Sequence, residues 1–324
     1  MRSFDIPART LLASILLTAV GASLAQQGYP SKTIRLITPY PAGGGTSVVA
    51  HLLGQKLSES WGQQVIVDNR PGGNTIIGTD SLAKSPPDGY TLILVVSTYA
   101  IVPSLFQTPY DPIKDLAQVS RIAESPSFLM VRSGLGVKTL AELVALGKEK
   151  PGQITFGSGG AGSSAHLATE LLLNVAGVKA LHVPFRGVAA AIADVIAGRV
   201  DMVIASLASG VAHVQAGTLV GLAVSGNKRS ELLPAVPTFA EAGQPRYDVS
   251  YWWGIAAPAA TPKPVVERLN REIIKACAQP RLREAFAKNA ALPATNTPDE
   301  MTAYLKSEIA KWARVVKAAG VQPE

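Results

Sequence analysis

The chain has 324 residues, of which 47% are hydrophobic, and this size and apolar content favour two lobes over a single domain. It carries 30 Lys and Arg against 23 Asp and Glu without a basic run or a zinc-finger spacing, so we expect no nucleic-acid partner. The formal charge of +7 suits an anionic small ligand, and the single cysteine excludes an intrachain disulfide.

The N-terminal segment has the features of a secretory signal peptide. Arg2 and Arg9 flank a short charged region, and residues 11–25 are all apolar or small. Ser23 and Ala25 place small side chains at the two positions that a signal peptidase reads. About 15 apolar residues fall short of the roughly 20 that span a bilayer, which disfavours an uncleaved anchor. We therefore expect residues 1–25 to be removed near Ala25 and the mature chain to reside in the periplasm.

The next part of the chain alternates short β-rich runs with helical periodicity. Strands are expected at residues 34–38, 65–68 and 90–96, and helices at 47–60 and 76–84. Strands and helices that alternate at this spacing predict a mainly parallel sheet with helices on both faces.

A second set repeats this order after an extended crossing at residues 119–131. A capping box of Thr139 and Glu142 predicts a helix over 140–146. Strands are expected at 154–157, 181–183, 201–205 and 219–224, with intervening helices that end at Gly177, Gly198 and Gly217. Another extended crossing at 249–257 leads to amphipathic C-terminal helices, which we expect to pack on the first sheet.

Glycine-rich loops follow three of these strands and precede helices. They span residues 39–47, 157–164 and 183–187, and the first two also carry hydroxyl side chains. The N-terminus of a helix has unpaired N–H groups and a partial positive charge, and glycine lets a ligand approach those donors. Such loops are also ordinary turns between strands and helices. Two such loops in facing lobes nevertheless favour a site that holds the two ends of one carboxylate ligand. Neither loop matches a phosphate-binding motif.

Catalytic signals are weak in this sequence. The four histidines have no metal-ligand spacing, and no nucleophile elbow occurs. His166 is the histidine that we consider for ligand contact, since it lies in the first turn after the second glycine-rich loop. Arg186 is either a bidentate carboxylate partner or a solvated surface residue. Cys277 continues the apolar stripe of its helix, which predicts a buried thiol without a catalytic role.

The chain resembles the Bug family, the periplasmic substrate-binding components of tripartite tricarboxylate transporters. The resemblance extends over essentially the whole mature chain and is specific through the order and spacing of its motifs. These are Tyr40-Pro41-Ala42-Gly43-Gly44-Gly45-Thr46, Asn69-Arg70-Pro71-Gly72, Pro87-Asp88-Gly89-Tyr90-Thr91, Tyr110-Asp111-Pro112, Gly162-Ser163-Ser164-Ala165-His166-Leu167, His182-Val183-Pro184-Phe185, Val236-Pro237-Thr238 and Ala257-Pro258.

This resemblance implies an α/β, two-lobed periplasmic-binding-protein fold of type II-like architecture with two interdomain crossings. Lobe I would comprise residues 26–124 and 249–324, and lobe II residues 125–248. The ligand would be a small carboxylate, held by main-chain donors and bridging waters around the first loop. The partners would be the large and small membrane subunits of the transporter. We expect a monomer without a cofactor, a metal or enzymatic activity; a sensory module for a signalling partner and a periplasmic enzyme are the alternatives.

Two positions depart from the family pattern. Ser47 stands where relatives often have Asp, and Ala205-Ser206 stands where they often have Asp-Asn. Because a buried ammonium group needs a matching carboxylate, we expect a mono- or dicarboxylate without an amino group, aliphatic or aromatic. Rings for contact would come from Tyr40, Phe185, Trp252 or Trp253, although at least one tryptophan is better read as buried at the hinge. The ligand-binding residues that we predict are Tyr40, Pro41, Ala42, Gly43, Gly44, Gly45, Thr46, Ser47, Ser97, Thr98, Ser158, Gly159, Ser163, Ser164, His166, Phe185, Arg186 and Ser206.

Overall fold

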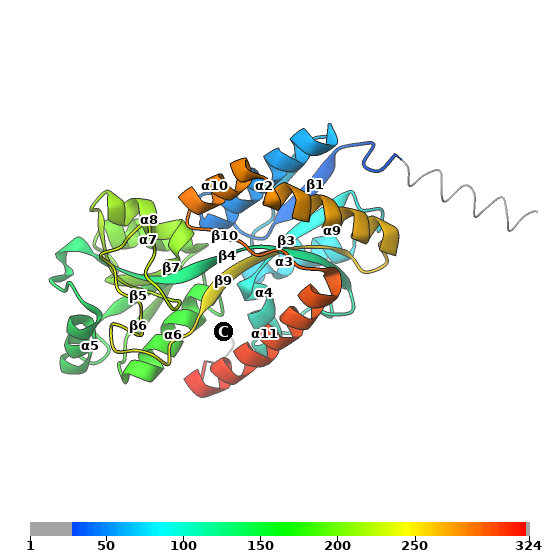
Figure 1. Cartoon of the computed structure of the whole chain (residues 1–324). Helices are drawn as coiled ribbons and strands as arrows, with labels where there is room; N and C mark the ends of the chain where they lie inside the picture. Colours follow the sequence, from blue (N-terminus) through cyan, green and yellow to red (C-terminus); the bar gives the residue numbers. More distant parts are fainter. Residues whose placement is uncertain (1–27, 322–324) are drawn as a thin grey trace, which may run out of the picture.

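The computed structural model describes residues 28–321, which form two lobes joined by long strands (Figure 1). The predicted signal peptide and its cleavage near Ala25 lie outside these residues. Within residues 28–321, no helix has the length and apolar character needed to cross a membrane. We use lobe I for the part that contains β1–β3, β9 and β10, and lobe II for the part that contains β5–β8.

Lobe I is built on a sheet with parallel and antiparallel pairs. The strands β2 (Val65–Asn69), β1 (Ile34–Thr38) and β3 (Thr91–Val96) are parallel neighbours, as predicted. The next strand, β9 (Ser250–Pro258), runs antiparallel to β3. The sheet is therefore mixed where the sequence predicted a mainly parallel one, because the strands that cross between the lobes run against their neighbours.

Helices cover both faces of this sheet. One face carries α2 (Gly45–Trp61), α9 (Lys263–Ala278) and α10 (Pro280–Lys288), whose apolar residues form one core with Cys277 inside it. Burial raises the pKa of the Cys277 thiol to about 12, as expected for an inert core cysteine. The other face carries the 3₁₀ turns η1 (Gly73–Thr75) and η2 (Val102–Ser104) with α3 (Ile76–Ala83), α4 (Ser97–Ile101) and α11 (Pro298–Ala319).

Lobe II repeats the layered arrangement around a second set of parallel strands. Its strands β7 (Met202–Ser206), β5 (Thr155–Ser158) and β6 (Leu181–Pro184) are parallel, and β8 (Leu219–Val224) pairs with β4. The turn η3 (Ser133–Leu135) precedes α5 (Leu140–Glu149), which packs with α6 (Ser164–Ala176) on one face. The helices α7 (Val188–Ile196) and α8 (Leu207–Gln215) pack on the other face.

The strand β4 (Leu116–Arg132) belongs to both lobes. It pairs antiparallel with β9 as far as Pro126, and from Ser127 onward it pairs with β7 and β8 instead. In lobe I it also pairs with the short strand β10 (Leu292–Pro293). The crossings predicted at residues 119–131 and 249–257 are thus two adjacent strands, which continue the hydrogen-bonded ladder from one lobe toward the other.

The C-terminal helix α11 packs on the first sheet as predicted, and in addition it contacts α6 of lobe II. Its capping box of Thr297 and Glu300 is formed. Glu308, one of its buried residues, accepts hydrogen bonds from the indole Nε1–H of Trp252 at 3.0 Å and of Trp312 at 3.2 Å. This shared carboxylate ties the helix to β9, next to the cleft.

Candidate functional site

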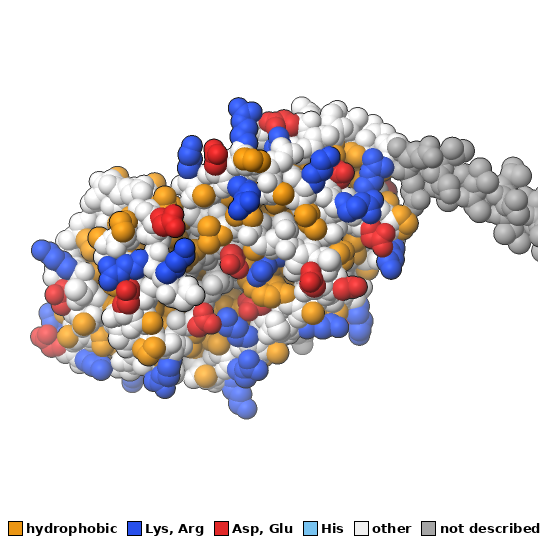
Figure 2. Space-filling model, in the orientation of Figure 1, with side chains coloured by type: hydrophobic (Ala, Val, Ile, Leu, Met, Phe, Trp, Pro, Cys, Tyr) orange, Lys and Arg blue, Asp and Glu red, His pale blue; other side chains and the backbone are white. Residues whose placement is uncertain are grey.

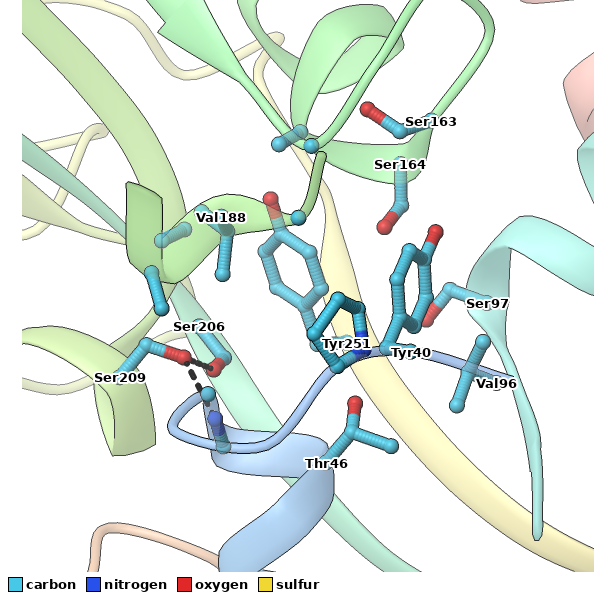
Figure 3. Close-up of a pocket in the computed structure, with 18 of the residues that line it drawn as sticks. Tyr40, Thr46, Val96, Ser97, Ser163, Ser164, Val188, Ser206, Ser209 and Tyr251 are labelled. Carbon is cyan, nitrogen blue, oxygen red and sulfur yellow. Dashed lines mark hydrogen bonds between the residues drawn. The ribbon is translucent and has the colours of Figure 1, made fainter. Parts of the chain in front are cut away.

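A cavity of about 200 Å³ lies between the two lobes (Figure 3). Lobe I contributes the first glycine-rich loop and the end of β3, lobe II contributes the N-terminal turns of three helices, and β9 forms the back wall. The lining residues are Tyr40, Pro41, Ala42, Gly44, Gly45, Thr46, Val96, Ser97, Gly159, Ser163, Ser164, Ala165, Arg186, Gly187, Val188, Ala189, Ala190, Ala205, Ser206, Ser209, Tyr251, Trp252 and Trp253.

Several helices begin at the wall of this cavity. The first residues of α2, α4, α6 and α7 line it, as do Ser206, the residue before α8, and Ser209 in its first turn. The first-turn N–H groups of a helix have no intrahelical acceptor, and the helix dipole places partial positive charge there. These helix ends therefore create a cavity suited to anionic oxygen atoms.

The first glycine-rich loop allows the lobes to approach closely. α2 begins at Gly45, two residues earlier than the sequence predicted, and the Gly45 N–H donates to Ser209 Oγ of lobe II at 3.1 Å. Ser209 Oγ also lies 2.8 Å from Ser206 Oγ. A β-carbon on Gly45 would lie 2.9 Å from Ser206 Oγ, so a side chain at this position would separate these groups.

A second set of polar contacts joins the lobes at the other end of the cavity. Thr98 Oγ1 of lobe I accepts a hydrogen bond from the Ser164 N–H at 3.1 Å, and it lies 2.8 Å from the Tyr40 hydroxyl. Ser163 caps α6 by accepting from the His166 N–H at 3.3 Å. Thr98 thus stands behind the wall and orients Tyr40 and Ser164, both of which line the cavity.

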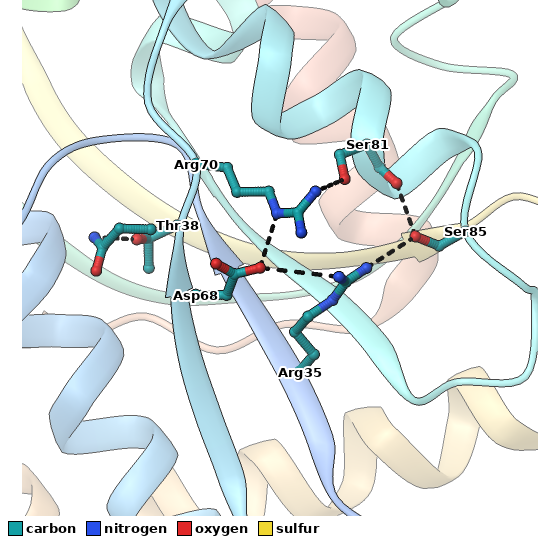
Figure 4. Close-up of polar contacts among 7 residues, drawn as sticks. Arg35, Thr38, Asp68, Arg70, Ser81 and Ser85 are labelled. Atoms are coloured by element: carbon teal, nitrogen blue, oxygen red, sulfur yellow. Dashed lines mark hydrogen bonds and ion pairs between the residues drawn. The ribbon is translucent and has the colours of Figure 1, made fainter.

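The loop that follows β2 is held by a charged network (Figure 4). Asp68 accepts from Arg70 Nε at 2.8 Å and lies 3.9 Å from Arg35 Nη1, while Arg70 also donates to Ser81 Oγ at 2.9 Å. This network fixes the base of the loop. At its tip, the Asn74 side-chain amide donates to the carbonyl oxygen of Ala161 in the second glycine-rich loop. The loop therefore spans the mouth of the cleft.

The cavity wall combines a positively charged side chain with neutral groups. Of the described residues that line it, Arg186 alone bears a formal charge, and none is a carboxylate. Burial raises the pKa of Tyr40 to about 12, although the hydrogen bond with Thr98 lowers it in part. Burial also raises the pKa of Tyr251 well above its usual value. Both phenols are consequently neutral hydroxyls at physiological pH.

The structure brings most of the predicted site residues together. Those on the cavity wall are Tyr40, Pro41, Ala42, Gly44, Gly45, Thr46, Ser97, Gly159, Ser163, Ser164, Arg186 and Ser206. Gly43, Ser47, Thr98, Ser158, His166 and Phe185 are outside that lining. Phe185 instead faces a second hollow of about 590 Å³, which adjoins the cavity at Tyr40 and Arg186. The contact of any of these residues with a ligand stays a prediction.

Sequence reasoning missed Tyr251, Ser209 and the small residues at the start of α7. Tyr251 lies on β9 between the lobes, and Ser209 is in the first turn of α8, so neither belongs to a glycine-rich loop. The two tryptophans differ from each other. Both are buried, but their indole groups have different partners. The Trp252 Nε1–H donates to Glu308 of α11, and the Trp253 Nε1–H donates to Thr46 Oγ1 at 3.1 Å, which supports the cavity wall.

Comparisons with known proteins agree with this geometry. The family described as "Tripartite tricarboxylate transporter family receptor" matches residues 49–321. BugT of Bordetella pertussis is 36% identical over 95% of both chains. A Rhodopseudomonas palustris protein solved with adipate is 33% identical, with a TM-score of 0.88 over 91% of this chain and 100% of that one. MatC of the same organism, solved with malate, is 27% identical, with a TM-score of 0.82 over 89% and 100%.

These matches confirm the resemblance to the Bug family and the two-lobed fold. The alternative of a periplasmic enzyme is excluded, because the members of this family bind substrates without converting them. The chain belongs to the tripartite tricarboxylate transporter receptor family and is a periplasmic solute-binding protein.

Proposed function

We propose that this protein captures a small organic mono- or dicarboxylate without an amino group and delivers it to the large and small membrane subunits of a tripartite tricarboxylate transporter. The observation that carries the proposal is the cavity to which the N-terminal ends of helices from both lobes converge and to which no described residue contributes a carboxylate. A cavity of that kind stabilises negative charge and offers nothing to balance a positive one.

The positions of the two departures from the family pattern support a ligand without an ammonium group. Ala205 lines the cavity and cannot carry a charge. Ser47 is buried in the first turns of α2, and its hydroxyl lies 3.5 Å from His51 Nδ1. An ammonium group desolvated in this cavity would lack an anionic partner, which costs several kcal/mol.

The middle of the cavity favours an organic ligand with an apolar body. Val188 and Tyr251 lie between the Ser163–Ser164 end and the Ser206–Ser209 end, and Val96 lies beside Ser97 on another side of the cavity (Figure 3). Each end offers hydroxyl groups and helix N–H groups, so a chain with a carboxylate at each end would match both. The similar proteins solved with adipate and with malate are bound to ligands of this class.

The strand pairings support the lobe boundaries that the sequence predicted. β4 exchanges β9 for β7 as its partner between Pro126 and Ser127, close to the predicted boundary at residues 124 and 125. We propose that residues 26–124 with 249–324 and residues 125–248 move as two bodies about this point, as a monomer. Residues 1–25 would serve as the signal peptide that takes the chain to the periplasm.

Calorimetry with matched ligands tests the ligand class. We expect adipate to bind more tightly than 2-aminoadipate, and succinate more tightly than aspartate, each by at least about tenfold. A tenfold difference corresponds to ~1.4 kcal/mol, which is a small part of the cost of burying an unmatched charge. Tighter binding of the amino acid in both pairs would show that the proposed ligand class is wrong.

A further inference from the structure

Two histidines lie behind the second glycine-rich loop and outside the cavity lining. His166 is in the first turn of α6, and His182 is on β6. Their rings are stacked, with centroids 3.9 Å apart and planes 7° from parallel, and Phe156 of β5 stacks on His182 at 4.9 Å. His166 is 7% exposed. Neither ring lines the cavity, so neither is explained by ligand contact.

Each ring contacts one end of the loop. His166 Nδ1 accepts a hydrogen bond from the Gly162 N–H at 3.0 Å. His182 Nε2 lies 2.6 Å from Ser158 Oγ, and Ser158 Oγ in turn bonds to both the N–H and the carbonyl oxygen of Gly160. Gly160 and Gly162 adopt φ angles of +123° and +76°, which only glycine adopts readily. The loop therefore needs these contacts to hold one conformation among the many open to glycine.

The contact with Gly162 fixes the protonation state of His166. Because Nδ1 accepts from an N–H group, it carries no proton, and the neutral ring has its proton on Nε2. Nε2 lies 3.7 Å from Glu170 Oε1. A second proton on the ring would have to bind at Nδ1, where it would face the Gly162 N–H, and the two donors would repel each other.

We propose that His166 and His182 are positioning residues that hold the Ser158–Ser163 loop in its ligand-binding conformation, and that protonation of this pair releases the loop and weakens ligand binding. The proposal rests on the proposed function in that Gly159 and Ser163 of this loop line the cavity. It adds a role to two residues that lie outside the cavity lining.

The side chains that contact the pair include one charged group. On α6 the facing group is Glu170, on β6 it is His182 itself, and β5 contributes the uncharged Phe156. Because the two rings are stacked, a charge on one histidine opposes a charge on the other. Burial, together with the charge of a protonated His166, lowers the pKa of His182 to about 4. A proton added at Nδ1 of His166 would replace the acceptor that holds the Gly162 N–H.

The decisive variant is His166→Asn, because the amide oxygen of Asn reproduces the acceptor at the position of Nδ1 and does not titrate. His166→Leu removes the acceptor, and His213→Asn is the matched control on α8. Adipate is the probe, measured by calorimetry at pH 7.5 and 6.0 on the mature full-length chain. The protonation of adipate itself changes by the same amount between these two pH values whichever variant is present. Only the differences in affinity between variants therefore report on the protein.

We expect the adipate affinity of the wild type and of His213→Asn to fall at least threefold from pH 7.5 to 6.0, beyond the change seen in His166→Asn. His166→Leu should bind about tenfold more weakly at pH 7.5, which is the loss of about one hydrogen bond. An equal pH response in His166→Asn and the wild type, or unchanged binding by a folded His166→Leu, would overturn the proposal.

A measurement without ligand separates this proposal from the proposed function. In ¹⁵N spectra of the ligand-free protein at pH 7.5, His166 should have its proton on Nε2, and the Gly162 amide should be protected from hydrogen exchange. Acidification to pH 6.0 should reduce that protection in the wild type and leave it unchanged in His166→Asn. An unprotected Gly162 amide at pH 7.5 would refute the positioning role even if adipate binds, and a protected amide that responds to pH as expected would support it even if adipate does not bind.

Discussion

Gly45 is the residue at which the two lobes come closest on the α2 side of the cavity. Its N–H bonds to Ser209, and a β-carbon there would lie 2.9 Å from Ser206 Oγ, 3.0 Å from Ser209 Oγ and 3.3 Å from the Ala208 β-carbon. These atoms all belong to lobe II. The missing side chain is thus required by the contact between the lobes and not by the fold of either lobe alone.

We predict that Gly45→Ala weakens adipate binding about tenfold, because the closed form has to accommodate an overpacked contact worth ~1–3 kcal/mol. The melting temperature of the ligand-free protein should change little. Gly54→Ala in the same helix is the control: its β-carbon would make ordinary contacts of 3.6 Å with Val65 and Val67, so affinity should be retained. Calorimetry and thermal melting check both. Equal affinity of Gly45→Ala and the wild type would contradict the prediction.

The lowered pKa of His182 predicts how stability depends on pH. Its pKa is 6.5 in an unfolded chain and about 4 in the fold, mainly through burial and further through the charge of His166. A protonated side chain is therefore favoured in the unfolded state, so this contribution to the free energy of unfolding is complete above pH 6.5 and is lost as the pH falls toward 4.

Urea denaturation of the ligand-free protein between pH 7.5 and 4.5 measures this loss. We expect His182→Gln, which keeps a polar contact for Ser158, to lose less stability over that range than the wild type does. His213→Gln should follow the wild type. The same pH dependence in all three proteins would mean that His182 is protonated as easily in the fold as outside it.

At the scale of elements, what the sequence predicts depends on how local the signal is. β1 and β8 have the predicted bounds, and the predicted capping box of Thr139 and Glu142 forms, because alternation and capping are properties of short segments. The start of α2 at Gly45 was missed because glycine is a poor marker of a helix interior. The antiparallel pairing of β4 with β9 joins residues more than a hundred positions apart, for which the sequence has no local signal.

The candidate site shows the same limit. Its glycine-rich loops were predictable because glycines and hydroxyls cluster in the sequence itself. Tyr251 was not, because it reaches the cavity only through the pairing of β9 with β4, where it lies opposite Ser125. His166 was predicted as a ligand contact from its place in the first turn of α6. The fold stacks its ring on His182 and bonds its Nδ1 to the Gly162 N–H, outside the cavity lining, and its contact with a ligand stays a prediction.

The loop after β2 yields a prediction at this scale, since Asn74 joins it to the opposite lobe. Asn74 has a left-handed φ of 49°, which glycine also adopts, so Asn74→Gly removes the hydrogen bond to Ala161 and keeps the backbone. We expect adipate to bind about fivefold more weakly, equivalent to ~1 kcal/mol for one hydrogen bond. The exposed Asn227→Gly is the control. Calorimetry that finds equal affinity for both variants would show that this contact does not favour closure.

At the scale of the whole molecule, the two lobes are joined through strands and also through α11. Lysine and arginine side chains are interspersed with acidic ones over both lobes on the face of the described residues shown in Figure 2, so this face offers no single large basic patch. Polar contacts that join the lobes at the cleft include Gly45 with Ser209, Thr98 with Ser164, and Asn74 with Ala161. Opening of the cleft would break these contacts and leave the β4 ladder intact.

Ligand-driven closure is the last prediction, and a disulfide between the lobes provides its reference state. A β-carbon on Gly43 would lie 3.7 Å from that of Ala189 across the cleft, within the range that a disulfide bridges, and the native Cys277 is buried and does not compete. Gly43 has a φ of +101°, so a side chain there is strained and the double variant should melt at a lower temperature than the wild type in the absence of the cross-link. The oxidised Gly43→Cys, Ala189→Cys protein should therefore give a compact small-angle scattering profile with or without adipate. The wild type should change from a more extended profile to that compact one at saturating adipate. At about 100 times the dissociation constant, its stability should rise by ~2.7 kcal/mol, which corresponds to several degrees in melting temperature. The reduced double variant, which lacks the covalent link, serves as the control for the substitutions themselves. A wild-type profile that stays the same while calorimetry shows saturated binding would mean that the lobes do not close over the ligand.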